Sequence, residues 1–232
     1  MHDGAPVAAG CARFPAESGR VGSVLDFDQA LDRLLTLLQR GDRVLLGIAG
    51  APGAGKTTLA EALVAAVAED GRFRAAHVPM DGFHLADVTL ERLGRLQRKG
   101  AIDTFDGWGY RAMLRRLRAH ENEPVFAPGF ERDLEQPIAG SIEVDPAVQL
   151  VVSEGNYLLV DASPWSDVGD LFDEVWFCEA SHAVRRARLV ARHVAFGKTP
   201  AEAEAWVAAV DLPNAALITS TRRRAAAVVA TV

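Results

Sequence analysis

Gly50-Ala51-Pro52-Gly53-Ala54-Gly55-Lys56-Thr57 stands between an apolar run at residues 44–49 and a helix-like segment at residues 58–68. The octapeptide fits the pattern G-x-x-x-x-G-K-[ST], which is typical of a loop that binds phosphate. Its glycines let successive backbone N–H groups point at phosphate oxygens, and the start of the following helix adds positive potential. We expect Lys56 to reach the β- and γ-phosphates of a nucleotide and Thr57 to ligate Mg²⁺.

A chance match is the alternative, because the chain is rich in Gly and Ala. With average residue usage, the pattern would occur by accident in roughly one chain of this length in a hundred. The surroundings also fit the motif, since a buried-type strand precedes it and Leu59, Leu63 and Val67 form one stripe of the following helix. The sequence therefore predicts nucleotide binding at residues 50–57, which we call the phosphate loop.

The composition indicates one globular unit. With 232 residues, of which 49% are hydrophobic, the chain can bury a sizeable core. We expect a disordered arm at residues 1–22, which are small and polar, and a single domain at residues 23–232. The net charge of −6 argues against a general nucleic-acid binder, since no basic surplus exists to neutralise a phosphate backbone.

The cysteines and the apolar runs indicate in which cellular compartment the protein is expected. Cys11 and Cys178 are the two cysteines, and they imply neither a disulfide framework nor a cysteine-based metal site. No apolar run approaches the length that crosses a bilayer. We expect a cytoplasmic protein with no membrane partner and no nucleic acid, with a homodimer as an open alternative.

Apolar runs alternate with amphipathic segments along the chain. Strands are expected at residues 44–49, 75–80, 149–153, 173–178 and 225–232. Helices are expected at residues 26–41, 58–68, 88–99, 110–120, 182–196 and 201–210, with a turn at 211–214. This order predicts an α/β fold, a P-loop NTPase three-layer sandwich in which a five-stranded parallel sheet carries helices on both faces.

Two acidic residues follow predicted strands. Asp81 comes directly after the strand at 75–80, and Glu154 after the strand at 149–153. Ligands gather outside the carboxyl ends of strands in open α/β sheets, so both side chains are placed for chemistry. An acid after a buried strand, downstream of a phosphate loop, reaches Mg²⁺ directly or through water. For Asp81 the alternative is a turn residue before Gly82.

Residues 121–145 contain no long periodic stretch. A long irregular segment with aromatic residues and a lone Arg132 favours a functional loop, here a substrate-side insertion with a short hairpin. A surface excursion is the alternative.

Arginines cluster on the helix that Ser181 is expected to cap. Arg185, Arg188 and Arg192 follow i, i+3, i+7 spacing and so share one face. A solvated basic face is one explanation. The other is a mobile lid whose arginines neutralise charge during phosphoryl transfer. The spacing leaves open which of the three arginines act.

Five further segments carry a resemblance to a known family. They are residues 79–84 (Pro-Met-Asp-Gly-Phe-His), 99–106, 127–132, 153–157 (Ser-Glu-Gly-Asn-Tyr) and 211–215 (Asp-Leu-Pro-Asn-Ala). From about residue 47 to its C-terminus the chain resembles the P-loop kinase family that includes uridine kinase, phosphoribulokinase and bacterial type I pantothenate kinase. Within that family it is similar to the small bacterial nucleoside/nucleotide kinase-like proteins labelled fructose-transport-system kinases.

The resemblance implies roles for single residues. Asp81 would accept or orient the proton of the acceptor hydroxyl, and Glu154 would help to hold Mg²⁺. Arg132 would hold the acceptor, while Arg188 and Arg192 would be the lid arginines. It also implies an acceptor-binding insertion at about residues 82–145 and a helical lid at about residues 181–205.

The predicted site residues form four sets. The catalytic set is Asp81, Lys56, Arg188 and Arg192. The ATP-binding set is Gly50, Ala51, Pro52, Gly53, Ala54, Gly55, Lys56, Thr57, Thr58 and Asn214. The acceptor-binding set is Asp81, His84, Phe130, Arg132, Glu154 and Tyr157, and Trp108 is expected to shape the same pocket, with core packing as the alternative for the aromatic residues. The metal ligands are expected to be Thr57, Glu154 and Asp81.

The predicted activity is an ATP- and Mg²⁺-dependent kinase. It would move the γ-phosphoryl of ATP to a hydroxyl of a small sugar-like, nucleoside-like or pantothenate-like molecule. The alternative is a regulatory or transport-associated P-loop NTPase whose hydrolysis serves a protein partner. Residues 121–145, which offer a substrate pocket, and the single Arg-lined helix favour the kinase. A binding module without catalysis is disfavoured, because Lys56, Thr57, Asp81 and Glu154 are all present.

Overall fold

The computed structural model describes residues 24–231. The arm expected at residues 1–22 and Cys11 lie outside the described residues.

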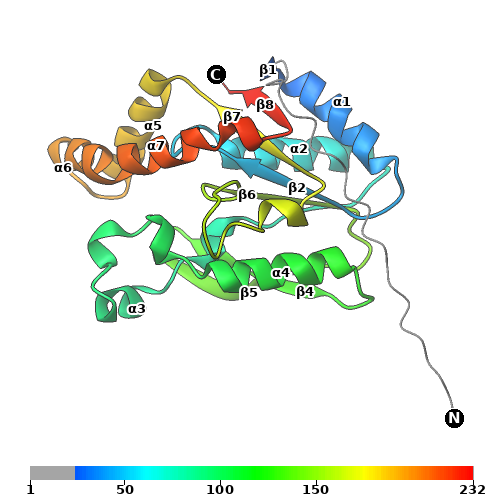
Figure 1. Ribbon diagram of the computed structural model, residues 1–232, viewed down its shortest axis with the longest axis horizontal. Helices are drawn as coiled ribbons and strands as arrows, with labels where there is room; N and C mark the ends of the chain where they lie inside the picture. The colour runs from blue at the N-terminus through cyan, green and yellow to red at the C-terminus, as the bar shows by residue number, and fades with distance from the viewer. Residues whose placement is uncertain (1–23, 232) are drawn as a thin grey trace, which may run out of the picture.

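A parallel sheet forms the centre of the fold (Figure 1). Its strand order is β1-β8-β7-β2-β6-β3. The strands are β1 (Val24–Leu25), β2 (Val44–Ala49), β3 (Ala75–His77), β6 (Leu150–Gly155), β7 (Glu174–Glu179) and β8 (Ala227–Ala230). The predicted fold class is confirmed, and each of the five expected strands is present. The predicted strand number was wrong, because β1 pairs with β8 as a sixth strand that is too short to show periodicity.

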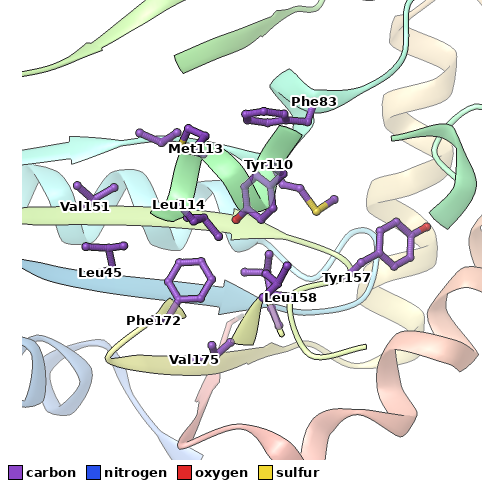
Figure 2. Packing of buried hydrophobic residues seen from close by; sticks show 14 of the residues in the cluster. Leu45, Phe83, Tyr110, Met113, Leu114, Val151, Tyr157, Leu158, Phe172 and Val175 are labelled. Atoms are coloured by element: carbon purple, nitrogen blue, oxygen red, sulfur yellow. The ribbon is translucent and has the colours of Figure 1, made fainter. Parts of the chain in front are cut away.

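The sheet separates two hydrophobic clusters, because successive side chains of a strand point to opposite faces. Leu46 of β2 packs with α1 (Phe27–Leu38) and α2 (Lys56–Asp70) on one face. Leu45 packs with α4 (Gly107–Ala119) on the other face. Figure 2 shows this second cluster, in which Leu114 of α4 and Leu45 lie among the same buried side chains. The three predicted layers are therefore present.

The chain between β3 and α4 differs from the prediction. The strand expected at 75–80 ends at His77, and a 3₁₀ turn at Met80–Phe83 follows Pro79, which has no N–H for a sheet ladder. The helix expected at 88–99 divides into α3 (Asp87–Arg92) and a 3₁₀ turn at Leu96–Arg98. Gly94 adopts a φ of +66°, which ends the helix between them.

Residues 121–145 contain the expected hairpin, formed by β4 (Val125–Glu131) and β5 (Gln136–Val144). Its β4 strand packs against the turn that carries Asp81. A Cβ atom at Gly82 would lie 2.0 Å from the carbonyl oxygen of Pro128, so only glycine allows this approach. The hairpin is thereby fixed beside the carboxyl edge of the sheet.

Three helices follow β7: two lie at one end of the sheet and the third runs from there back along it toward β8 (Figure 1). They are α5 (His182–Ala195), α6 (Pro200–Trp206) and α7 (Leu212–Ser220). Ser181 caps α5 as predicted, since its hydroxyl accepts a hydrogen bond from the Val184 N–H. The turn predicted at 211–214 was wrong: a π-helical turn at Val207–Asp211 joins α6 to α7 without a break. Pro213 is the second residue of α7 and comes directly after this π turn, so its missing N–H falls where the helical hydrogen-bond pattern already changes.

Candidate functional site

The phosphate loop joins β2 to α2, and its backbone geometry requires glycine. Gly53 and Gly55 have φ values of +75° and +93°, in the left-handed region that favours glycine. A Cβ atom at Gly50 would lie 2.6 Å from the carbonyl oxygen of Cys178. A loop of small residues that leads into a helix N-terminus forms a cradle for an anion. This geometry fits the phosphates of ATP.

Lys56 crosses from the loop to the neighbouring strand. Its Nζ donates a hydrogen bond of 2.7 Å to Oδ1 of Asn156, just beyond the end of β6, and lies 3.4 Å from the Ala51 carbonyl oxygen. The amide of Asn156 thus fixes the ammonium group next to Glu154. The sequence prediction missed Asn156 as a site residue, although its place after a buried strand is the signal that identified Glu154.

Thr57 and Glu154 form the pair that could hold Mg²⁺. The Thr57 hydroxyl donates a hydrogen bond of 2.9 Å to Oε1 of Glu154, which is only 4% exposed. Burial, with the nearby negative charge of Asp81, raises the pKa of Glu154 to about 7, against the opposing effect of Lys56. Hard oxygen donors are the ligands that Mg²⁺ prefers, and phosphate oxygens and water would complete its shell. Within residues 24–231, no group of three or more His, Cys, Asp or Glu side chains is placed to hold a metal alone.

Asp81 faces these groups from the 3₁₀ turn after β3. Its Oδ2 lies 3.8 Å from Nη2 of Arg132, which follows β4. Its backbone carbonyl oxygen accepts a hydrogen bond of 2.8 Å from Nδ1 of His84. That bond places the imidazole proton on Nδ1, and burial lowers the pKa of His84, so the ring is held neutral. The ring centroid of His84 lies 4.0 Å from that of Phe105 and 4.9 Å from that of Phe130.

One cavity of about 360 Å³ brings most of the predicted residues together. Its lining contains both loop residues and acceptor-side residues from the predicted sets: Pro52, Gly53, Lys56, Asp81, His84, Phe130, Arg132, Glu154, Arg192 and Asn214. The cavity is not lined by the remaining loop residues, Gly50, Ala51, Ala54, Gly55 and Thr57, and Thr58 is exposed in the first turn of α2. The donor and acceptor halves of the predicted site therefore share one space.

Two predicted pocket residues lie elsewhere. Tyr157 was expected to contact the acceptor, but its side chain is fully buried and its hydroxyl donates to the Gly100 carbonyl oxygen at 2.7 Å. Figure 2 shows it at the border of the hydrophobic cluster. Trp108 was expected to shape the pocket, but it is 60% exposed on α4 and packs on Arg111. Tyr157 therefore follows the core-packing alternative, whereas Trp108 lies on the surface, which neither reading predicted.

The arginines of α5 divide by position. Arg192 lines the cavity, and Nη1 of Arg188 lies 3.4 Å from the carbonyl oxygen of Gly53 in the phosphate loop. The backbone of Arg185 packs on the same glycine, while its side chain lines a groove between α5 and α7. Arg188 and Arg192 are therefore the two that face the site.

The sequence prediction also missed polar contacts among residues that line the cavity. Lys99 bonds Oδ1 of Asp87 at 2.7 Å and the Glu135 carbonyl oxygen, so it ties α3 to the hairpin. His193 donates to Asp211 at 2.9 Å. The spacing of these residues along the chain gives no signal for such pairs.

In the described part of the chain, no helix has the length and apolar character needed to cross a membrane.

Comparison with known proteins places this site in a family. No family model matches the chain. A Schizosaccharomyces pombe protein named "Putative uridine kinase" is 35% identical over 187 residues, which cover 78% of this chain and 80% of that protein. The Escherichia coli protein YggC, described as uncharacterised, is 30% identical over 184 residues, which cover 79% and 76% of the two chains.

A solved structure agrees with these relatives. It is titled a "putative fructose transport system kinase" from Silicibacter sp. TM1040, and it is 38% identical with a TM-score of 0.74. The match covers 87% of this chain and 98% of the other. The phosphate loop, the acidic residues Asp81 and Glu154 and these relatives agree. The chain therefore belongs to the P-loop kinase family that includes uridine kinase and pantothenate kinase.

Proposed function

We propose that this protein transfers the γ-phosphoryl of ATP to a hydroxyl group of a small sugar-like, nucleoside-like or pantothenate-like molecule. One observation carries the proposal: Lys56 and Glu154 line the same cavity as Asp81 and Arg132. The first two lie where a nucleotide phosphate and its metal would bind. The second two lie across the cavity, where an acceptor would enter.

The donor side binds and orients the triphosphate. The loop backbone and Lys56 would hold the phosphates, and Thr57 with Glu154 would hold Mg²⁺. The ion, when bound, would offset the negative charge of the phosphate oxygens. Arg188 and Arg192 on α5 add positive charge from the opposite side of the loop.

On the acceptor side, Asp81 would take the proton of the acceptor hydroxyl. The acceptor hydroxyl would donate to a carboxylate oxygen of Asp81, which thereby orients the hydroxyl oxygen toward the γ-phosphorus. A bond forms between that oxygen and the phosphorus, the bond from the phosphorus to the β–γ bridging oxygen breaks, and ADP leaves. The proton passes to Asp81 and then to water. Arg132 would hold the rest of the acceptor beside the ring of Phe130.

The proposal assigns the parts of the chain as well. Residues 23–232 would form a single kinase domain, in which about 82–145 are the acceptor-binding insertion and about 181–205 the lid. The position of α5 against Gly53 supports the lid, because its arginines reach the loop directly.

The test is acceptor-dependent ADP formation. Purified protein with ATP and Mg²⁺ is supplied with single sugars, nucleosides or pantothenate, and ADP is measured over time. The kinase predicts that one class of acceptor raises the rate well above the basal hydrolysis. ADP formation that responds only to an added protein would instead support a regulatory NTPase.

A further inference from the structure

A buried pair of polar side chains joins α5, the arginine-bearing helix, to the π-helical turn that precedes α7. His193 Nε2 donates to Asp211 Oδ2 at 2.9 Å, with side-chain exposures of 16% and 10%. His193 follows Arg192 on α5, and all three residues line the cavity. A buried carboxylate is costly unless it is paired, so this contact fixes how α5 meets α7.

The π-helical turn Val207–Asp211 is what places the Asp211 carboxylate against His193. A π turn is rare and recurs at functional sites, because one extra residue rotates the following side chains. The neighbouring turn, at the start of α7, carries Asn214. Its Nδ2 lies 3.5 Å from the Gly100 carbonyl oxygen, at the long end of hydrogen bonding.

Gly100 belongs to the opposite side of the cavity. Its carbonyl oxygen also accepts the Tyr157 hydroxyl at 2.7 Å, and Tyr157 follows β6, the strand of Glu154. Lys99, its neighbour, lines the cavity with Phe105. We call residues 96–105 the acceptor wall. Two polar contacts therefore link α5 to the acceptor wall: His193 to Asp211, and, three residues along the same helical backbone, Asn214 to Gly100.

We propose that Asp211 and Asn214 are positioning residues that couple the Arg192-bearing helix to the acceptor wall. When nucleotide draws the arginines of α5 toward the phosphate loop, Asp211 and Asn214 move the acceptor wall with them. Neither residue needs to touch a reacting atom. This inference rests on the proposed function, since it assumes that a nucleotide binds at the phosphate loop.

The experiment measures hydrogen–deuterium exchange with and without Mg²⁺ and AMP-PNP, a non-hydrolysable ATP analogue. In the unaltered protein, the nucleotide should slow exchange both at residues 50–58 and at the acceptor wall. Asp211→Ala should keep the slower exchange at residues 50–58 and lose it at the acceptor wall, and Asn214→Ala should lose it at the acceptor wall. Asp211→Asn should restore the slower exchange at the acceptor wall, because the amide oxygen still accepts a hydrogen bond from the His193 N–H.

The matched control is Glu204→Gln. Glu204 pairs with Arg186 at 2.5 Å and also joins α5 to α6, but both side chains face solvent. This variant should keep nucleotide protection in both segments. Turnover gives a second readout: Asp211→Ala should lower kcat by roughly 10- to 100-fold while the KM for ATP stays within about threefold, and Asp211→Asn should recover most of kcat.

Three results would overturn the proposal. One is protection of the acceptor wall in Asp211→Ala and Asn214→Ala equal to that of the unaltered protein. Another is a loss of kcat that Asp211→Asn does not recover. The third is no protection of the acceptor wall in the unaltered protein while residues 50–58 are protected. Absence of protection at residues 50–58 in the unaltered protein would contradict nucleotide binding. That result would overturn the proposed function itself, not only the coupling.

Discussion

Nη2 of Arg132 lies 3.8 Å from Oδ2 of Asp81, too far for a hydrogen bond, and both side chains remain partly open to the cavity. Their exposures are 44% and 33%, and an ion pair of this kind adds little to stability. The contact between the two groups therefore contributes little to the stability of the fold. An acceptor could place a hydroxyl on the carboxylate and another polar group on the guanidinium.

Asp81→Asn should lower kcat by about 10²- to 10⁴-fold, the usual contribution of a general base. The amide keeps the size of the side chain but cannot take the acceptor's proton. Because the phosphate loop is untouched, the Kd for ATP, measured by calorimetry, should change by less than about threefold. Unchanged turnover with a confirmed acceptor would remove Asp81 from the mechanism.

Arg132→Gln should raise the KM for the acceptor by roughly 10-fold or more and leave the KM for ATP near its original value. The guanidinium lies beside Asp81, the group proposed to take the acceptor's proton. Steady-state kinetics with each substrate varied in turn give both constants. A rise in the KM for ATP alone would show that Arg132 acts on the nucleotide and not on the acceptor.

Glu154→Gln should make the ligand-free protein more stable at pH 8. The pKa of Glu154 is raised from 4.5 to about 7 in the folded chain, so the folded state holds this proton more tightly. The free energy of unfolding therefore falls as the pH rises from about 4.5 to about 7, by up to roughly 3 kcal/mol. A neutral amide avoids that loss.

Thermal unfolding at two pH values measures this effect. At pH 8 the variant should melt several degrees above the unaltered protein, whereas at pH 4 the two should nearly coincide, because Glu154 is protonated in both states. The variant should also lose the extra stabilisation that Mg²⁺ adds to ATP. A lower melting temperature than the unaltered protein at pH 8 would contradict the burial argument.

Gly82→Ala should lower stability by about 1–3 kcal/mol and reduce turnover as well. The new methyl group would lie 2.0 Å from the Pro128 carbonyl oxygen and must displace β4 or the turn that carries Asp81. A shift of either one separates Asp81 from Arg132. Urea unfolding and turnover together test this, and a variant with full stability and activity would show that the contact between hairpin and turn is not needed.

Local chemistry in the sequence predicted much of the site. The phosphate loop has a fixed spacing, and Asp81 and Glu154 follow apolar strands, so the sheet edge where they meet could be inferred before any contact was known. The capping of α5 by Ser181 and the hairpin in 121–145 were likewise readable from short segments.

Features that depend on packing could not be predicted. Pro213 suggested a turn, yet it lies where a helix tolerates proline, and the π turn before it leaves no pattern in the sequence. Tyr157 and Trp108 are aromatic residues near predicted site segments, but tertiary packing buries one and exposes the other. The pair of His193 and Asp211 joins two helices whose approach is set by the sheet beneath them.

Transfer of a labelled γ-phosphoryl group tests the central claim most directly. ATP labelled at the γ-phosphate is incubated with the protein, Mg²⁺ and a single acceptor from the sugar, nucleoside or pantothenate classes, and the products are separated. The kinase predicts label on an organic product that forms with one acceptor class and is lost in Asp81→Asn. Label that leaves ATP only as inorganic phosphate, with every acceptor and at an unchanged rate, would contradict the account.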